Sequence, residues 1–506
     1  MASRVLASRT RGQQRMWMLS GIAALLSLIP VLFVPISGFV DAPAHMARHH
    51  IMAMAASGGP LSRYFEVQWH WIGNLGEDIP AALIGRWLGG EMATRLITAV
   101  IAPLTIAGII AVSRAAHGRV AASAMLALPF AFHQAWMYGF LNYCFGTALA
   151  FLVGAWILAR KNETLAGQLG LAAAGIVVWT AHLASWGILV LLAAANELGA
   201  LRKPHDLMGA AWRNAPLLLP LLPLVFWRLQ AAGSDFSIVY DAFVLTKFTA
   251  FAGALRGTWA EVDLPLLAVI AVSALTALLW ARPRIVEPRL FLAGLLLSAA
   301  ALAAPVYLLN SWGTDLRTAP VALIILILSI KPAADPRREE LICLLGVTFF
   351  AVRLTSVTWS WLERSPELER RLEMLEAVPH GGRLGYLYVP PSCDRWKLLP
   401  DEKLGSYAVT RREAFVNTLF MVDNARLVTI RDPRFQARWT SDSQTIAREC
   451  PENKPDLLAL RQSLGEMRRD GFDAIWISGV AQQDLPTVPG YAIARRRPHE
   501  AMLVRR

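Results

Sequence analysis

Long apolar runs recur along almost the whole of this 506-residue chain, and they constrain its fold more than any other feature. A helix needs about 17–25 residues to cross the hydrocarbon core of a bilayer, and most of the runs approach that length. Hydrophobic residues make up 55% of the chain and charged residues only 17%, which is far from the usage of soluble proteins. The sequence therefore predicts a polytopic α-helical membrane protein with about eleven transmembrane helices. The runs lie near residues 16–36, 92–112, 120–137, 142–159, 165–181, 184–198, 214–230, 264–281, 289–308, 318–331 and 340–357.

The basic residues between the runs predict the orientation of the chain. A net charge of +12 would suit a nucleic-acid partner in a soluble protein, but here the charges form short clusters in alternate loops. Cytoplasmic loops carry such clusters, so we expect a cytoplasmic N-terminus, a C-terminal segment on the opposite side and no nucleic-acid partner. No small-residue cleavage pattern follows the first run, which we interpret as an anchor. The clusters contain Arg114, Arg119, Arg160, Lys161, Arg202, Lys203, Arg213, Arg282, Arg284, Arg289, Lys331, Arg337 and Arg338.

The loops predicted on the external face differ in kind, because they carry most of the groups suited to chemistry. The first of them, residues 37–91, also has an apolar stretch, Ile79–Leu88, which is too short to span and suits an interfacial or re-entrant helix. The polar candidates in this loop are Asp41, His45, His49, His50, Glu66 and His70. Further candidates on the same side are Asn142, His182, Lys247, Arg256 and Arg317. Chemistry is therefore expected at the external surface of the membrane.

Residues 361–506 have the composition of a soluble domain. Short β-type runs such as "GRLGYLYV" and "FDAIWIS" accompany helical spacing over residues 455–470, which predicts a small α/β domain. An odd number of spans places this domain in the periplasm. Cys393 and Cys450 both lie in it, where an oxidising compartment permits a disulfide, and their pairing is left open. No CxxC pair, zinc-ligand spacing or Walker-type loop occurs, so we expect any driving energy to come from the substrate.

The layout resembles that of the GT-C superfamily, membrane glycosyltransferases that use polyprenyl-phosphate sugars. The resemblance depends on Asp41 in "GFVDAPAHMARHH", the aromatic "YGFLNY", the "DLRTAP" segment and the C-terminal exported domain. Oligosaccharyltransferases, protein mannosyltransferases and lipid A aminoarabinose transferases share this layout. The resemblance implies a transmembrane domain over residues 1–360, whose first external loop carries the active site. It also implies hexosyl or pentosyl transfer on the external face of a bacterial inner membrane.

The residues suit that reaction on chemical grounds. An acceptor hydroxyl must lose its proton as it attacks the anomeric carbon, and Asp41 is the candidate general base. A guanidinium matches the planar, multi-oxygen geometry of a phosphate, so Arg317 is expected to bind the donor phosphate. Lys247 and Arg256 are expected to assist Arg317. The candidates for contact with the sugar or acceptor are His45, Glu66, His70, Asn142 and His182.

A plainer interpretation of Asp41 is that it starts a helix. Asp41 precedes Pro43 by two residues, the arrangement of an N-cap with proline in the first turn, and a capping carboxylate can also face a cavity. Such a helix would bring Asp41, His45 and His49 near one face. Imidazole and carboxylate suit zinc or manganese, but the first loop has no clear DxD or ExD pair. A divalent ion is therefore left open, and no other cofactor is expected.

The remaining candidates also have structural interpretations. Glu66 and His70 suit solvated loop positions, with the neighbouring aromatic residues anchored in the membrane interface. Asn142 and His182 lie at predicted span ends, where polar side chains bond neighbouring helices. Arg317 at a span end also suits snorkelling to lipid headgroups.

Two other functional classes stay open. A transporter or flippase of a lipid-linked substrate would place ionisable residues near mid-membrane, whereas these spans are almost free of charge. A non-catalytic subunit of an envelope polysaccharide assembly machine would use the C-terminal domain for binding. For the transferase, the expected partners are a polyprenyl-phosphate-linked sugar, a lipid, glycan or protein acceptor, and membrane lipids.

Overall fold

The structure is a computed structural model that divides into two compact units. It describes residues 2–55, 58–160, 164–200, 207–230, 238–281, 285–308, 311–394, 396–419, 427–439, 443–450 and 452–506. Unit 1 comprises Met1–Phe33, Trp71–Glu77 and Thr98–Trp359. Unit 2 comprises Val34–His70, Asp78–Ile97 and Ser360–Arg506. The first long loop is thus largely grouped with the C-terminal segment. The predicted basic positions Lys161, Arg202, Lys203, Arg282 and Arg284 lie outside the described residues.

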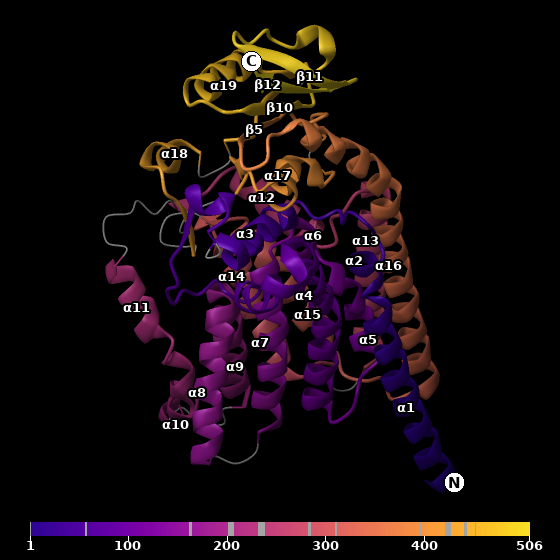
Figure 1. The fold of residues 1–506 in the computed structure, drawn as a ribbon. Coiled ribbons are helices and arrows are strands. Elements are labelled where there is room, and N and C mark those ends of the chain that lie inside the picture. The colour runs from indigo at the N-terminus through magenta and orange to yellow at the C-terminus, as the bar shows by residue number, and fades with distance from the viewer. Residues whose placement is uncertain are drawn as a thin grey trace. The chain divides into compact units, whose positions relative to one another are not determined.

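Unit 1 is built almost entirely from helices (Figure 1). Its helices are α1 (Ala2–Leu26), α2 (Ile29–Leu32), α5 (Ser123–Ala127), η3 (Leu128–Phe132), α6 (Gln134–Tyr138), α7 (Leu141–Ala159), α8 (Leu165–Ala181), α9 (Leu183–Ala200), α10 (Leu207–Asn214), η5 (Ala215–Leu218), α11 (Leu221–Gln230), α12 (Phe243–Ala252), α13 (Ala260–Trp280), α14 (Pro288–Ala303) and α15 (Thr314–Ser329). The strands β2 (Ile238–Val239), β3 (Tyr307–Leu308) and β4 (Ser311–Trp312) form a small antiparallel sheet. Two long helices, α4 (Asp78–His117) and α16 (Pro336–Leu372), belong partly to each unit.

Membrane-spanning character is confirmed by the helices themselves. Within the described residues, six helices are long and apolar enough to cross a bilayer by length and composition. They are Gly12–Leu32, Asp78–His117, Leu141–Ala159, Leu183–Ala200, Ala260–Trp280 and Pro336–Ala377. The apolar helices α8, α12 and α14 are shorter. The total of about eleven crossings therefore stays a prediction.

The apolar run near residues 120–137 is not one helix. It divides into α5, η3 and α6, because Pro129 has no amide hydrogen to donate and the backbone at His133 is extended (φ −71°, ψ 165°). Residues 120–140 are buried throughout. This run therefore forms an interior segment of unit 1, so its apolar character reflects burial in protein.

Close helix packing and a paired charge hold unit 1 together. Helices α7, α8 and α9 lie side by side, and α14 packs against α15 (Figure 1). A Cβ atom at Gly294 would come within 2.6 Å of the Leu326 side chain, so glycine permits the close approach of α14 to α15. Arg353 of α16 donates to Asp263 of α13 at 2.7 Å, and both side chains are almost completely buried. Arg353 also donates to the Phe132 carbonyl, so this buried charge has partners.

Unit 2 contains a five-stranded mixed sheet with the strand order β11-β12-β10-β5-β6. Strands β5, β6 and β10 run parallel, whereas β12 is antiparallel to both β10 and β11. The strands of unit 2 are β1 (Phe65–Val67), β5 (Arg383–Tyr388), β6 (Phe415–Val416), β7 (Val428–Ile430), β8 (Arg448–Glu449), β9 (Lys454–Pro455), β10 (Ala474–Ser478), β11 (Tyr491–Arg497) and β12 (Glu500–Arg505). Its helices are α3 (Ala42–Met54), η2 (Pro60–Arg63), η6 (Glu373–Ala377), η7 (Pro400–Ser406), α17 (Tyr407–Arg412), α18 (Pro433–Arg438), α19 (Leu457–Arg469) and η8 (Gln482–Asp484). The periplasmic placement of residues 361–506 stays a prediction.

Helix α19 shows how the sequence builds this unit. Its start is capped by Asp456, whose carboxylate accepts from the Ala459 amide at 2.9 Å. Leu460, Leu464 and Met467 recur at helical spacing and are buried. A Cβ atom at Gly385 of β5 would lie 2.4 Å from the Met467 sulfur, so glycine lets α19 pack closely on the sheet.

The first long loop is part of the core of unit 2. Strand β1 pairs antiparallel with β7, and the Tyr64 hydroxyl donates to the Gly381 carbonyl at 2.6 Å. The apolar stretch Ile79–Leu88 forms the first arm of α4, which ends where Gly89 takes positive φ (74°). The predicted short helix is therefore present. This packing shows that the loop is an ordered element rather than a solvated connector.

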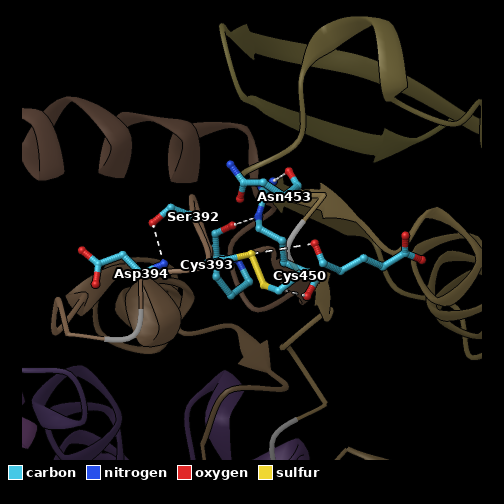
Figure 2. The surroundings of a disulfide bond; sticks show 8 residues. Ser392, Cys393, Asp394, Cys450 and Asn453 are labelled. Atoms are coloured by element: carbon cyan, nitrogen blue, oxygen red, sulfur yellow. Dashed lines mark hydrogen bonds between the residues drawn. A yellow bond between two sulfur atoms is a disulfide. The ribbon is translucent and has the colours of Figure 1, made fainter.

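Cys393 and Cys450 form a disulfide, which settles the pairing that the sequence left open (Figure 2). The bond joins the segment after β5 to the β8–β9 hairpin, across a sequence separation of 57 residues. The chain-entropy model assigns a loop of that length about 4 kcal/mol of stabilisation. Cys144 and Cys343 are free and buried.

Candidate active site and its comparison with known structures

Asp41 lies at the start of helix α3. The helix begins at Ala42, with Asp41 at the N-cap position and proline in the first turn, as the sequence predicts. The Asp41 side chain makes no capping hydrogen bond, however, and it is partly exposed while residues 42–49 are buried. The carboxylate therefore does not serve the helix as its cap, and its exposed part can meet another group.

A buried polar network lies one to two turns further along α3. Arg48 donates from Nε to Asp78 Oδ1 at 2.7 Å and from Nη2 to His45 Nδ1 at 3.0 Å. His49 Nδ1 lies 2.7 Å from Thr94 Oγ1, and its Nε2 lies 3.4 Å from Asp78 Oδ1. The network fixes α3 against α4. It also places the Arg48 charge beside His45, and binding of a divalent ion by Asp41, His45 and His49 stays open.

Arg48 and Thr94 were not among the candidate residues predicted from the sequence. For Arg48 a signal existed, since three residues separate it from His45 and bring both to one helix face. Thr94 lies in an apolar span and gives no such signal. The long-range partner Asp78 is separated from Arg48 by 30 residues.

The burial of His49 predicts a pH-dependent stability. Burial lowers the pKa of His49 below its ordinary value of 6.5, so folding favours the neutral imidazole. As the pH falls through about 6.5, the unfolded chain binds a proton at this residue more readily than the folded protein does, so the free energy of unfolding should fall. Thermal unfolding between pH 7.5 and 5 should show a shallower dependence on pH for His49→Gln than for wild type. Equal slopes in the two proteins would contradict this account of His49.

Glu66 and His70 lie elsewhere in unit 2. Glu66 belongs to β1, opposite Thr429 of β7, and is partly exposed. His70 Nδ1 lies 2.9 Å from the Gln68 carbonyl oxygen, and the neighbouring Trp69 is 57% exposed. Their contact with sugar or acceptor stays a prediction.

Arg317 lies in the first turn of α15, against the "YGFLNY" segment. Its guanidinium carbon is 4.1 Å from the centre of the Phe140 ring and 6.0 Å from that of Tyr143. Nη1 of Arg317 donates to Ser311 Oγ at 2.7 Å. The Tyr143 hydroxyl donates to the Arg317 carbonyl at 2.7 Å. Both the main chain and the side chain of Arg317 are therefore positioned.

A second arginine shares the same aromatic surface. The Arg256 guanidinium lies 5.5 Å from the Tyr138 ring centre, and Tyr138 stacks on Phe140 with a centroid distance of 5.4 Å. Trp312 packs edgewise on both rings. We call Tyr138, Phe140, Arg256, Trp312 and Arg317 the arginine–aromatic cluster. Two guanidinium groups therefore lie against stacked aromatic rings, and a guanidinium is the side chain best suited to an anion with several oxygens.

Lys247 has a different environment from the two arginines. It is buried, and its ammonium donates to Asp315 Oδ2 at 2.8 Å and to the Ala304 carbonyl. Since Asp315 is equally buried, the pair compensates its own charge. This favours a structural role that fastens α12 to the start of α15. The predicted contact of Lys247 with a donor phosphate stays untested.

Asn142 and His182 both lie in unit 1. Asn142 Oδ1 accepts from the Glu77 amide at 2.6 Å, and Nδ2 donates to the Asn74 carbonyl at 2.9 Å. Asn142 therefore anchors the segment before α4. His182 ends α8, accepts from the Ala184 amide at 3.1 Å and packs edgewise on Tyr143 at 5.4 Å. Through Tyr143 it adjoins Arg317.

Comparison with solved structures shows that the chain shares its fold with a known membrane protein, in agreement with the layout that the sequence predicts. The chain is similar to ArnT from Cupriavidus metallidurans in its crystal structure bound to undecaprenyl phosphate, with 11% identity and a TM-score of 0.51. That similarity covers 97% of this chain and 98% of ArnT. Arabinofuranosyltransferase AftD from Mycobacteria matches 97% of this chain and 40% of its own, with 15% identity and a TM-score of 0.47. No protein-family model and no curated protein sequence matches the chain.

Proposed function

We propose that the chain is an integral membrane glycosyltransferase that moves a sugar from a polyprenyl phosphate to an acceptor on the external face of the membrane. The observation that carries the proposal is the fold, which is similar to that of ArnT over 97% of the chain. In that crystal structure ArnT is bound to undecaprenyl phosphate. The arginine–aromatic cluster supports the same donor class, because it contains two guanidinium groups and this group suits a phosphate.

In this proposal Arg317 binds the donor phosphate and Arg256 assists it. Negative charge develops on the phosphate as the glycosidic bond breaks, and a positioned guanidinium stabilises that charge. The position of Arg317 in the first turn of α15 adds the positive end of the helix dipole. Lys247 contributes to phosphate binding indirectly. It neutralises the negative charge of Asp315, which lies in the same first turn of α15 as Arg317.

Asp41 is the proposed general base. A partly exposed carboxylate that does not cap its helix can accept the proton of an attacking hydroxyl. The rigid, buried α3 behind it limits its motion, which favours a defined geometry for the attack. His45, Glu66, His70, Asn142 and His182 are the proposed contacts for sugar or acceptor, and the transferred sugar is a hexosyl or pentosyl group.

A transfer assay separates this proposal from a transporter. Proteoliposomes with the full chain would receive polyprenyl phosphate carrying a radiolabelled sugar, together with a membrane extract as the source of acceptor. A transferase moves the label from the lipid to another molecule. Label that stays on the lipid and only changes leaflet would refute the transferase and favour a flippase.

The proposed orientation has the N-terminus in the cytoplasm of a bacterial inner membrane and the C-terminal segment in the periplasm. Three exposed positions test it, Gln68 and Arg434 on the proposed outer side and Met208 on the proposed inner side. A membrane-impermeant maleimide added to intact spheroplasts should label cysteines placed at Gln68 and Arg434 but not one at Met208. The native cysteines give a low background, because two are buried and two are paired. Labelling of the cysteine at Met208 alone would show that the chain has the opposite orientation.

A further inference from the structure

Unit 2 contains a pocket that none of the proposed catalytic residues uses. It has a volume of about 550 Å³ and lies where the parallel strands β5 and β10 end, at Tyr388 and Ser478. The start of β12, at Glu500, forms another part of its wall. Pockets at the carboxyl ends of parallel strands are the usual ligand sites of α/β sheets.

One arginine organises the pocket wall. Arg371 donates to Asp401 at 2.7 Å, to Glu500 Oε1 at 2.8 Å and to Ser478 Oγ at 2.9 Å. Its charge and its donors are therefore engaged within the protein. The wall it holds together is polar but locally compensated in charge.

Two buried polar atoms of this wall have no hydrogen-bond partner among the residues that the structure describes. They are the Tyr388 hydroxyl and Glu500 Oε2, and each side chain is only 4% exposed. Arg497 Nε lies 3.7 Å from Glu500 Oε2, which is too long for a hydrogen bond, and Arg371 binds the other carboxylate oxygen. Burial raises the pKa of Glu500, because the ionised carboxylate loses contact with water in the folded protein. Buried polar atoms are normally paired, so both atoms point to a ligand.

The hydrogen-bonding capacity of these two atoms indicates which class of ligand fits the pocket. The ionised Glu500 oxygen accepts a hydrogen bond and therefore needs a donor, whereas the Tyr388 hydroxyl can donate or accept. A hydroxyl group satisfies both atoms. A fully ionised phosphate has no hydrogen to donate, and a carboxylate would repel it. A ligand with several neighbouring hydroxyl groups, such as a saccharide, fits this wall.

The rim of the pocket is fixed before any ligand arrives. The Cys393–Cys450 disulfide ties the segment after β5 to the β8–β9 hairpin (Figure 2). Pro391, Arg448 and Asn453 from these segments line the pocket. Arg448 donates to the carbonyls of Pro390, Asn453 and Gly479. Such preorganisation lowers the entropy cost of binding a polar ligand.

We propose that this pocket binds a saccharide unit of the acceptor, which makes the acceptor a glycan or glycolipid. The assignment of the saccharide to an acceptor rests on the proposed transferase function, whereas saccharide binding itself does not. The C-terminal part of the chain then selects the acceptor through its hydroxyl groups. Tyr388 and Glu500 are the specificity-determining residues.

Tyr388→Phe tests the pocket by removing only the unpartnered hydroxyl. Binding to the full chain in nanodiscs would be measured by calorimetry with maltotriose, mannotriose, galactotriose and arabinotriose, and with inorganic phosphate as a competing probe. We expect at least one trisaccharide to bind and Tyr388→Phe to weaken it roughly fivefold to tenfold, the size of one hydrogen bond. The thermal stability of the unliganded protein should stay equal or rise, because a buried unpaired hydroxyl is lost.

The matched control is Tyr491→Phe. The Tyr491 hydroxyl has a partner, the Phe472 carbonyl, so this variant should lose stability and keep saccharide affinity. Failure of all four trisaccharides, binding of phosphate alone, or equal affinities for wild type and Tyr388→Phe would each overturn the saccharide pocket. Asp41→Asn should bind the trisaccharide as wild type does. Saccharide binding without any sugar transfer by wild type would refute the transferase and leave the pocket standing.

Discussion

Asp41→Asn should slow sugar transfer at least ~100-fold, the lower end of the effect of losing a general base. The amide has nearly the shape of the carboxylate but cannot take the proton of the acceptor hydroxyl. The substitution should lower the rate of transfer at saturating donor concentration and leave the affinity for the donor little changed. The measurement is release of radiolabelled sugar from polyprenyl phosphate by the purified variant in nanodiscs.

This substitution separates catalysis from capping. Asparagine caps helices as well as aspartate does, so a residue that only starts α3 should tolerate the change. Asp456→Asn is the matched control, since Asp456 caps α19 through its side chain and lies at an N-cap as Asp41 does. Both variants should stay folded, and only Asp41→Asn should lose transfer. Transfer by Asp41→Asn near the wild-type rate would show that Asp41 is not the base.

Arg317→Met should reduce kcat/KM for the lipid-linked donor by roughly 100-fold to 1,000-fold, as expected when a group that stabilises developing charge is removed. Methionine keeps an apolar contact with Phe140 but cannot bind an anion. Arg317→Lys should recover only part of the activity, because an ammonium lacks the planar fork of a guanidinium and stacks less well on the ring. Steady-state kinetics with varied donor would measure both variants.

Arg434→Met is the control for a general loss of positive charge, since Arg434 is highly exposed and forms a local ion pair with Asp432. It should leave donor kinetics unchanged. If Arg317→Met matched this control, the arginine–aromatic cluster would have no part in donor binding. A loss confined to folding would instead appear as a lowered melting temperature in Arg317→Met and in Arg317→Lys alike.

Local sequence patterns predicted the elements well where local chemistry decides the structure. Pro43 after Asp41 marked the start of α3, and the spacing of Leu460, Leu464 and Met467 marked α19. The run near residues 120–137 was misleading, because burial inside a membrane protein and exposure to lipid select the same apolar residues. Periodicity alone cannot distinguish them, and Pro129 with an extended His133 then breaks the helix.

The candidate site was predictable only in part, because partners distant in the chain decide which charges are compensated. Lys247 and Asp315 are 68 residues apart, and no local pattern pairs them. The same holds for Arg48 and Asp78. By contrast, the aromatic "YGFLNY" and "DLRTAP" segments were both singled out, and the structure brings Phe140 of the first against Arg317 of the second.

The pocket at Tyr388 and Glu500 had no signal in the sequence. Its walls come from segments between residues 367 and 500, and its informative property is a hydrogen bond that is missing. Only a folded structure shows which polar atoms lack a partner. The disulfide that braces the rim was an open alternative in the sequence for the same reason, since spacing does not fix connectivity.

The claim that joins the fold to the function is that Arg317 holds the phosphate of a lipid-linked sugar. A structure of the wild-type protein with a bound polyprenyl-phosphate sugar tests it most directly. Phosphate oxygens should then lie within hydrogen-bond distance of the Arg317 guanidinium, with the Phe140 and Tyr138 rings against the two arginines. A donor phosphate held by other residues, beyond hydrogen-bond distance of the Arg317 guanidinium, would contradict it.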